Sequence, residues 1–182
     1  MSTQQGETLV TDEMRSVVGK VMRSATSFPI SVSDIRKWAM AIYYPAIPPR
    51  LFWDEEYAAA TKWGGVIAPE EFNPFAWMTK DPPPRELAPV TTDGYQRFSA
   101  LEAVFGLDTP PYRAILQSRV IATYSKVRMR PGDVIRSESH ISEYFEREGR
   151  MGLQLYTTVS DNLFNQHGEW IKRLDTVFVR YL

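Results

Sequence analysis

Cysteine is absent from this sequence, and histidine occurs only twice. Without cysteine the chain can form no disulfide framework, no thiolate metal site and no cysteine nucleophile. The two histidines, His140 and His167, lie far apart and without the spacing of metal ligands. We therefore expect a protein that holds neither a metal ion nor another cofactor.

The sequence also lacks a strong charge of either sign and any long apolar run. Its 21 basic and 22 acidic residues give a formal net charge of -1, which offers no electrostatic footprint for nucleic acid or an anionic membrane surface. No apolar run approaches the roughly 18 residues that cross a bilayer. The N-terminal stretch lacks the basic-then-apolar pattern of a secretory signal. These absences predict a cytoplasmic, soluble protein that binds neither nucleic acid nor membrane.

The first half of the chain predicts short helices. Thr11, Ser33 and Asp54 are each suited to cap a following helix, and a short strand is expected about residues 24–31. The stretch "VIAPEEFNPFAWM", which begins at Val66, is apolar and predicts a further helix. Its proline suits a first helical turn, and the two acids that follow suit the positive end of the helix dipole.

The second half predicts strands. Four runs rich in strand-forming residues cover 114–129, 133–148, 152–164 and 169–181, separated by "RPGD", "EGRMG" and "NQHGE", which have the chemistry of hairpin turns. The preceding segment, 79–111, is rich in proline, glycine and polar residues, and its length suggests a lid or a dimer arm. The expected fold is α+β, with a long helix packed on a curved, meandering antiparallel sheet.

Four segments together resemble a known family. They are "SVSDIRKWAMAI", "LFWDEEYAAATKWGGVIAPEEF", "RMRPGDVIRSESHISEYFEREGRMG" and "NLFNQHGEW". They resemble the MaoC-like hydratases and dehydratases, specifically their FAS1-like dehydratase N-terminal domain. The resemblance covers nearly the whole chain. It implies a single hotdog domain over residues 1–182, in which a curved antiparallel sheet wraps a long central helix and 79–111 is an insertion.

The same resemblance locates a loop that corresponds to the catalytic loop of the family and lacks its catalytic residues. Complete relatives carry D-x-N-P-[IL]-H, whose Asp and His hold one water and move its proton to or from a trans-2-enoyl thioester. Alignment on Asp54 places Ile47 at the Asp position and Phe52 at the His position. A shifted alignment does not help, because no Asp, Glu or His lies between Lys37 and Leu51. The catalytic dyad is absent, and Phe52 suits the wall of an apolar pocket.

The apolar stretch around two consecutive glycines is the expected substrate site. Glycines ahead of a helix let a ligand approach the backbone, and free N–H groups at a helix start can polarise a thioester carbonyl. The alternative is a plain helix stop followed by a turn. The predicted substrate-binding residues are Gly64, Gly65, Val66, Ile67, Ala68 and Phe72.

Charged residues nearby have two interpretations each. Lys126, Arg128 and Arg130 alternate along an expected strand, so they would share one face and could contact the phosphates of coenzyme A, or blunt a solvated sheet edge. Glu70 and Glu71 could act on a thioester as the carboxylate of a thioesterase, or simply start a helix.

Three functions follow. The resemblance favours a non-catalytic, acyl-binding subunit that pairs with a second hotdog subunit bearing D-x-N-P-[IL]-H. The pair would form an (R)-specific 2-enoyl-CoA hydratase or 3-hydroxyacyl dehydratase acting on acyl-CoA or acyl-carrier thioesters, with bulky long-chain, polyketide or steroid side-chain acyl groups. One alternative is a homodimer that binds an acyl or other apolar ligand without turnover. The other is an acyl-CoA thioesterase that uses a carboxylate on the central helix.

Overall fold

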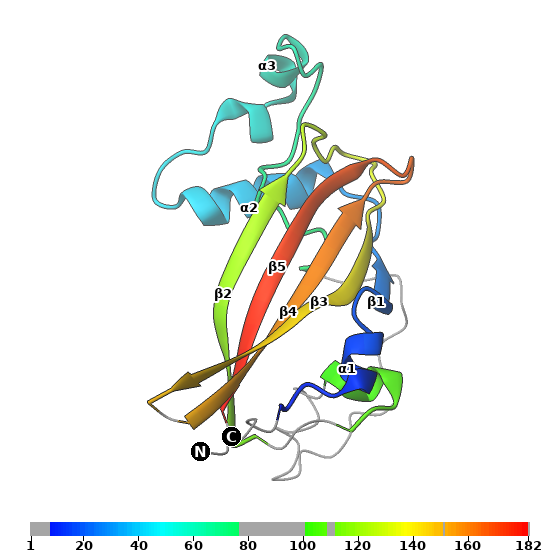
Figure 1. Cartoon of the computed structure of the whole chain (residues 1–182). Helices are drawn as coiled ribbons and strands as arrows, with labels where there is room; N and C mark the ends of the chain where they lie inside the picture. The colour runs from blue at the N-terminus through cyan, green and yellow to red at the C-terminus, as the bar shows by residue number, and fades with distance from the viewer. Residues whose placement is uncertain (1–7, 77–100, 109–111, 151, 182) are drawn as a thin grey trace, which may run out of the picture.

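One antiparallel sheet dominates the structure. The computed structural model describes residues 8–76, 101–108, 112–150 and 152–181. Its five strands lie in the order β1-β3-β4-β5-β2, and the sheet is strongly twisted and curved (Figure 1). The strands are β1 (Val21–Thr26), β2 (Ala114–Tyr124), β3 (Arg136–Gly149), β4 (Gly152–Phe164) and β5 (Trp170–Tyr181). The expected α+β class is confirmed.

The expected strand order is only partly right. β3, β4 and β5 form a meander, with Gly149 opposite Gly152 in the first hairpin. β2 pairs with β5, however, from Ala114 opposite Tyr181 to Tyr124 opposite Lys172. The "RPGD" sequence therefore makes a turn without joining neighbouring strands. That turn packs on another segment instead, where the Gly132 N–H donates to the Ile30 carbonyl over 2.7 Å.

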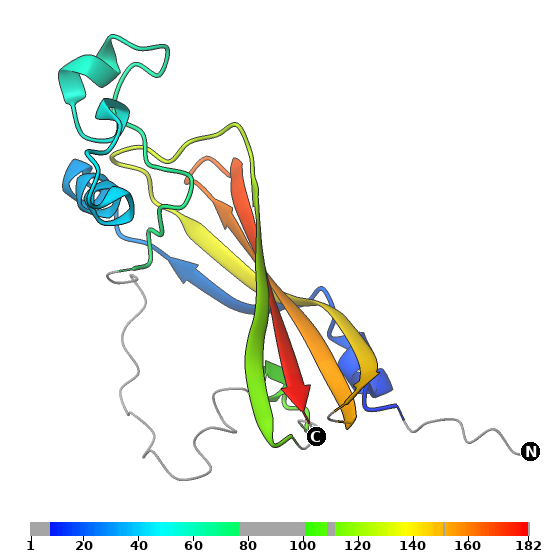
Figure 2. The ribbon, with the colours of Figure 1, turned by 90° about the vertical axis from the view of Figure 1, so that its left-hand side faces the viewer.

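The helices are short and lie at the two ends of the sheet. Figure 2 shows α2 and α3 at one end and α1 toward the other. None of the helices in the described ranges is long and apolar enough to cross a membrane. The expected cytoplasmic location stays a prediction. The helices are α1 (Asp12–Ser16), α2 (Val32–Tyr43), α3 (Glu55–Ala59) and the short 3-10 helices η1 (Arg50–Phe52) and η2 (Leu101–Phe105).

Two of the three predicted helix caps are confirmed. Thr11 caps α1, and Asp54 caps α3. Ser33 lies inside α2, whose cap is Ser31. The Ser31 hydroxyl accepts a hydrogen bond from the Asp34 N–H at 3.1 Å, and the Asp34 carboxylate accepts one from the Ser31 N–H at 3.1 Å. This reciprocal capping box satisfies two helix-start donors at once, so the helix begins two residues earlier than predicted.

The helix predicted from Val66 does not form over its described part, which ends at Ala76. In a helix the Glu70 carbonyl would accept from the N–H four residues later, but residue 74 is a proline and has none. The Lys172 ammonium takes that carbonyl instead, at 3.0 Å, and the Phe72 carbonyl at 2.8 Å. The segment is therefore held as a series of turns against β5.

The main core lies where α2, the segment that begins at Val66 and one end of the sheet meet. Its members include Ile35 from α2, Phe72, Ile135 and Leu163 from β4, all at most 3% exposed. A second, smaller cluster packs α1 on the other end of the sheet through Met14. The predicted insertion at 79–111 lies largely outside the described residues, and the single-domain boundary stays a prediction.

Candidate functional site

The loop that resembles a catalytic loop is fixed by its own contacts. The Trp53 indole N–H donates to the Pro48 carbonyl over 3.0 Å, and Arg50 pairs with Asp54 at 2.7 Å. Ile47 is 82% exposed. The position at which the resemblance places the catalytic Asp therefore lies in solvent.

Phe52, at the histidine position, is half-buried and lines a hollow of about 250 Å³. Its ring lies 6.0 Å from that of Tyr43, at the end of α2. Of the predicted substrate-binding residues, Ile67 and Ala68 line the same hollow. The charged residues at its rim are Glu70, Glu71 and Arg128.

The remaining predicted substrate-binding residues do not line this hollow. Val66 and Phe72 are 5% and 1% exposed and belong to the main core. Gly64 and Gly65 follow α3 and precede no helix in the described residues. Gly64 has φ +65°, which suits the turn that ends this short helical stretch. The helix start on which the predicted oxyanion hole depends is absent over residues 66–76, and substrate binding at the predicted residues stays a prediction.

The predicted basic stripe is also wrong in its geometry. β2 ends at Tyr124, so Lys126, Arg128 and Arg130 follow the strand and do not alternate on it. Arg128 forms an ion pair with Glu70. Arg130 donates to the Trp63 carbonyl over 2.7 Å. Contact of these residues with coenzyme A phosphates stays a prediction.

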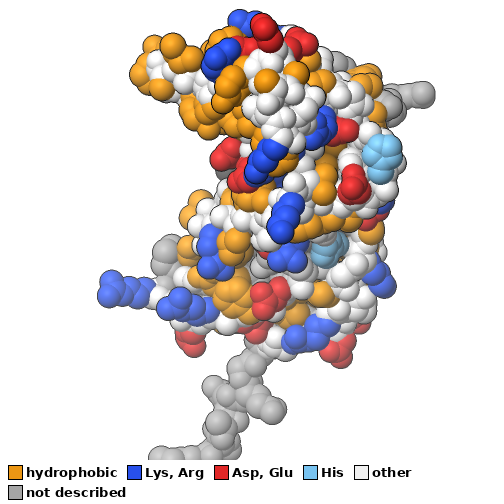
Figure 3. All heavy atoms as spheres, turned by 90° about the horizontal axis from the view of Figure 1, so that it is seen from above, with side chains coloured by type: hydrophobic (Ala, Val, Ile, Leu, Met, Phe, Trp, Pro, Cys, Tyr) orange, Lys and Arg blue, Asp and Glu red, His pale blue; other side chains and the backbone are white. Residues whose placement is uncertain are grey.

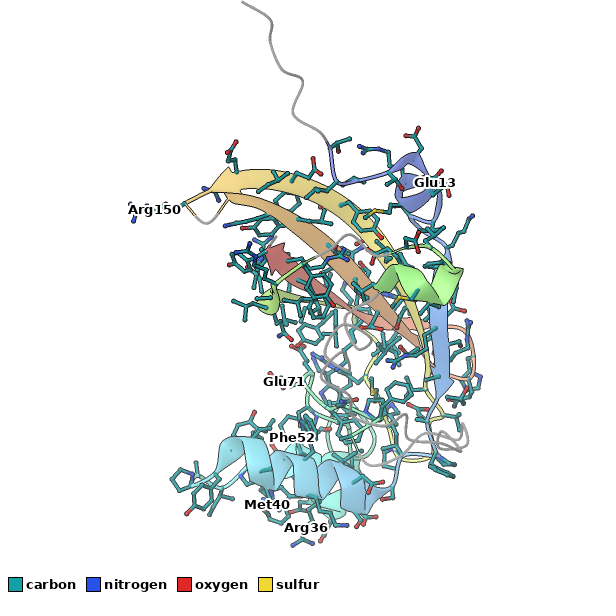
Figure 4. The ribbon with its side chains drawn as sticks, turned by 90° about the horizontal axis from the view of Figure 1, so that it is seen from below. Glu13, Arg36, Met40, Phe52, Glu71 and Arg150 are labelled. Atoms are coloured by element: carbon teal, nitrogen blue, oxygen red, sulfur yellow. The ribbon has the colours of Figure 1, made fainter. Side chains whose placement is uncertain are left out.

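The two candidate thioesterase carboxylates lie on turns, because no helix forms there. Glu70 is engaged by Arg128. Glu71 is exposed and has no hydrogen bond or ion pair among the described residues. In Figure 4 the Glu71 side chain stands in the space between α2 and the sheet. It lines both the small hollow and a larger cavity.

The larger cavity, which we call the sheet cavity, was not foreseen from the sequence. It has a volume of about 1,040 Å³ and is lined by all five strands, α2 and the segment that follows Val66. Its apolar walls include Trp38, Phe75, Leu163 and Leu174. Its charged lining residues are Arg23, Glu71, Asp161 and Lys172.

Lys172 is the most perturbed charged group of this cavity. Its side chain comes from β5 and the residue is only 2% exposed. Burial lowers the pKa of Lys172 to about 8, and the Glu71 and Glu70 carboxylates oppose part of that decrease. Burial also raises the pKa of the neighbouring Tyr124 hydroxyl. Perturbed titratable groups in a cavity mark candidate functional residues.

The two histidines lie away from both cavities. His140 is on β3, opposite Val21 of β1. His167 occupies the turn before β5, where its N–H donates to the Asn165 side chain over 3.0 Å. Neither histidine lines the hollow at Phe52 or the sheet cavity.

Solved structures with similar folds define the class of the protein. The ChsH1-ChsH2 complex from Mycobacterium tuberculosis matches with a TM-score of 0.61 and 14% identity, covering 87% of this chain and 83% of that one. The HadBC (3R-hydroxyacyl-ACP dehydratase) complex from the same organism matches with 0.52 and 16%, covering 87% and 96%. The MaoC-like dehydratase from Rhodospirillum rubrum matches with 0.51 and 16%, covering 88% and 92%. The chain is a hotdog-fold protein with the MaoC-like architecture.

The family follows from the sequence. Residues 16–174 match the profile of the FAS1-like dehydratase domain region. The chain belongs to this family, and the resemblance carried by its four segments is confirmed. No match was found among curated proteins.

Proposed function

We propose that this chain is the non-catalytic, acyl-binding subunit of a heteromeric (R)-specific 2-enoyl-CoA hydratase or 3-hydroxyacyl dehydratase. The observation that carries the proposal is the state of the two dyad positions. Ile47 stands in solvent, and Phe52 lines a hollow without being able to exchange a proton. Neither side chain can donate or accept the proton that hydration of an enoyl thioester requires. The acid and base must then come from a second hotdog subunit bearing D-x-N-P-[IL]-H.

An open sheet edge supports a partner. β2 pairs with β5 on one side only, within the described residues. Three of its apolar side chains are strongly exposed, namely Leu116 at 56%, Val120 at 49% and Ile121 at 42%. A long, apolar edge strand is a template for association with another chain. Two of the similar structures are themselves complexes, ChsH1-ChsH2 and HadBC.

A second exposed apolar region lies at the end of the molecule that carries α2 and α3. Figure 3 shows hydrophobic side chains gathered over this end. Tyr44 and Ile47 are 84% and 82% exposed, and Met40 on α2 is 41% exposed. Apolar groups clustered at a surface in this way mark contact sites for other molecules. The loop that resembles a catalytic loop is thus better suited to contact a partner subunit than to catalyse hydration.

The sheet cavity supports a bulky acyl group as the ligand. Cavities that hold drug-sized ligands measure about 300–1,000 Å³. The sheet cavity, at about 1,040 Å³, lies just above that range and has aromatic and aliphatic walls. An acyl-CoA or acyl-carrier thioester would place its acyl group there, and the proposal requires no cofactor.

The direct test is reconstitution. The tagged chain is purified from its host lysate, and native mass spectrometry identifies any second subunit. We expect a hotdog-sized partner with Asp and His in its loop, and hydration of 2-enoyl-CoA only by the complex. Substitution of the partner's histidine should abolish the activity. Hydration by this chain alone at enzyme-like rates would show the proposal to be wrong.

One observation favours a second candidate, an acyl-CoA thioesterase. The Glu71 carboxylate lines both the hollow at Phe52 and the sheet cavity, and within the described ranges no ion pair occupies it. Acyl-CoA hydrolysis lost in Glu71→Gln and retained in Glu70→Gln would support this candidate. A homodimer that carries a bound apolar ligand and turns over no thioester would instead support the binding protein without activity.

A further inference from the structure

The ammonium of Lys172 has an unusual place in the sheet cavity. Two of its hydrogen bonds go to the carbonyls of Glu70 and Phe72, at 3.0 and 2.8 Å. A protonated lysine carries three N–H donors, so one donor is left over. The side chain is nearly fully buried and yet lines the cavity. The Tyr124 ring centroid lies 5.9 Å from Nζ, a weak cation–π contact, and the Glu71 and Glu70 carboxylates are close enough to act on the charge of Lys172.

A second donor without an acceptor borders the same end of the cavity. The indole Nε1 of Trp38 is buried and has no hydrogen-bond partner among the described residues. Trp38 packs edge-on against the Phe72 ring at 5.8 Å, so Trp38 and Lys172 both adjoin Phe72. A buried polar group without a partner costs free energy that a suitable acceptor would recover. The sheet cavity therefore holds two donors with unused hydrogen-bonding capacity, beside the Glu71 carboxylate.

The charged side chains that line the sheet cavity favour a ligand whose hydrogen-bond acceptor is neutral. Its described lining holds two basic side chains, Arg23 and Lys172, and two acidic ones, Glu71 and Asp161. The formal charges cancel, so an anionic ligand gains no net attraction from the lining. A neutral oxygen can still accept a hydrogen bond from an ammonium, which is stronger than a bond between neutral groups.

We propose that Lys172 is the specificity-determining donor of the sheet cavity and selects bulky apolar ligands that carry a neutral carbonyl oxygen. The apolar body of the ligand packs on Phe75, Leu163 and Leu174, and its carbonyl accepts the third N–H of Lys172. This inference deepens the proposed function and rests on it where it takes the ligand to be an acyl group. Lys172 thus serves two purposes, fixing the turn at Glu70–Phe72 and recognising the ligand.

A matched pair of probes separates recognition from a purely structural role. Fluorenone and fluorene are rigid tricyclic molecules that differ in one carbonyl oxygen. Equilibrium dialysis with the full chain should show fluorenone bound about tenfold more tightly, the value of one charge-assisted hydrogen bond. In Lys172→Met this preference should disappear, so that the two probes bind with about equal affinity. The exposed Lys20, outside the cavity, provides the control, because Lys20→Met should keep the tenfold preference.

The outcomes distinguish the possibilities. Equal weakening of both probes in Lys172→Met, with the preference retained, would show that Lys172 only shapes the cavity. An absence of preference in the unmodified chain, or no binding of either probe, would also overturn the inference. If the variant fails to fold, the Lys172 ¹³Cε resonance of the unmodified chain decides, and it should shift with fluorenone and not with fluorene.

The test is independent of the partner subunit. A complex that hydrates 2-enoyl-CoA while the chain shows no Lys172-dependent preference would contradict the inference alone. A Lys172-dependent carbonyl preference in a chain that has no partner would contradict the proposed function alone.

Discussion

Arg180 on β5 and Glu102 on η2 form a bidentate ion pair in the interior, with N–O distances of 2.8 and 2.7 Å. The two side chains are 1% and 0% exposed. Thr157 of β4 accepts a further bond from Arg180 at 2.6 Å, and the Tyr144 hydroxyl of β3 donates to Glu102 at 3.0 Å. Glu102 thereby fixes η2 to β5 and β3, and Arg180 extends the network to β4.

Removal of one charge of this pair should be strongly destabilising. Glu102→Ala leaves the Arg180 guanidinium buried without its counter-ion, which typically costs about 3–5 kcal/mol. Urea denaturation should report this loss. The more exposed pair of Arg136 and Glu138 on β3 is the control, and Glu138→Ala should cost at most about 1 kcal/mol. Equal losses in the two variants would contradict a special role for the buried pair.

The cap of α2 gives a prediction with a built-in control. Ser31→Ala removes the hydroxyl that accepts from the Asp34 N–H and should cost about 1 kcal/mol of unfolding free energy. Ser33→Ala removes a hydroxyl from the helix interior and should change stability by less than about 0.5 kcal/mol. Chemical denaturation of both variants checks the assignment of the cap, and the reverse order of losses would refute it.

Lys172 should make stability depend on pH in a defined direction. Its folded pKa of about 8 lies below the ordinary value of 10.5, so above pH 8 the unfolded chain binds more protons than the folded one. The unfolding free energy contributed by this group therefore rises with pH from about 8 toward 10.5. The difference between the unmodified chain and Lys172→Met should increase over pH 8–9.5 in urea titrations. The raised pKa of Tyr124 acts in the opposite direction above pH 10, so measurements stop below it. A flat difference would contradict the lowered pKa.

The exposed edge strand should be required for subunit association. Leu116→Lys places a charge on β2 outside both cavities and should weaken the complex by tenfold or more, because charges on an edge strand oppose pairing. Val104→Lys on η2, where the side chain is 59% exposed, should leave association unchanged. Analytical ultracentrifugation of the reconstituted complex measures both. Unimpaired association of Leu116→Lys would exclude β2 from the interface.

Local signals made much of the fold predictable. The strand expected at 152–164 matches β4, since turn sequences bound it on both sides. The caps at Thr11 and Asp54 are likewise properties of a few neighbouring residues. The predicted meander holds for β3, β4 and β5, but the pairing of β2 with β5 is a long-range property that no local pattern encodes. The first strand was expected at 24–31 and lies at Val21–Thr26.

The site was harder to predict than the fold. The prediction that the dyad is absent follows from the residue types at positions 47 and 52 together with the family resemblance. The helix after Val66 fails at Pro74, which has no N–H for the Glu70 carbonyl, and Lys172, about a hundred residues away, donates to that carbonyl instead. One signal for Lys172 was present in the sequence. Consecutive strand residues face opposite sides of a sheet, so either Lys172 or Arg173 had to face the covered side.

The solvent position of Ile47 has a consequence for any attempt to engineer activity. A designer who restored the motif by Ile47→Asp and Phe52→His would put the imidazole at the wall of the hollow and leave the carboxylate in bulk water. The two groups would then lie in different surroundings. Rebuilding a hydratase from this chain would therefore mean changing the backbone conformation between Tyr44 and Trp53 as well as the side chains at positions 47 and 52.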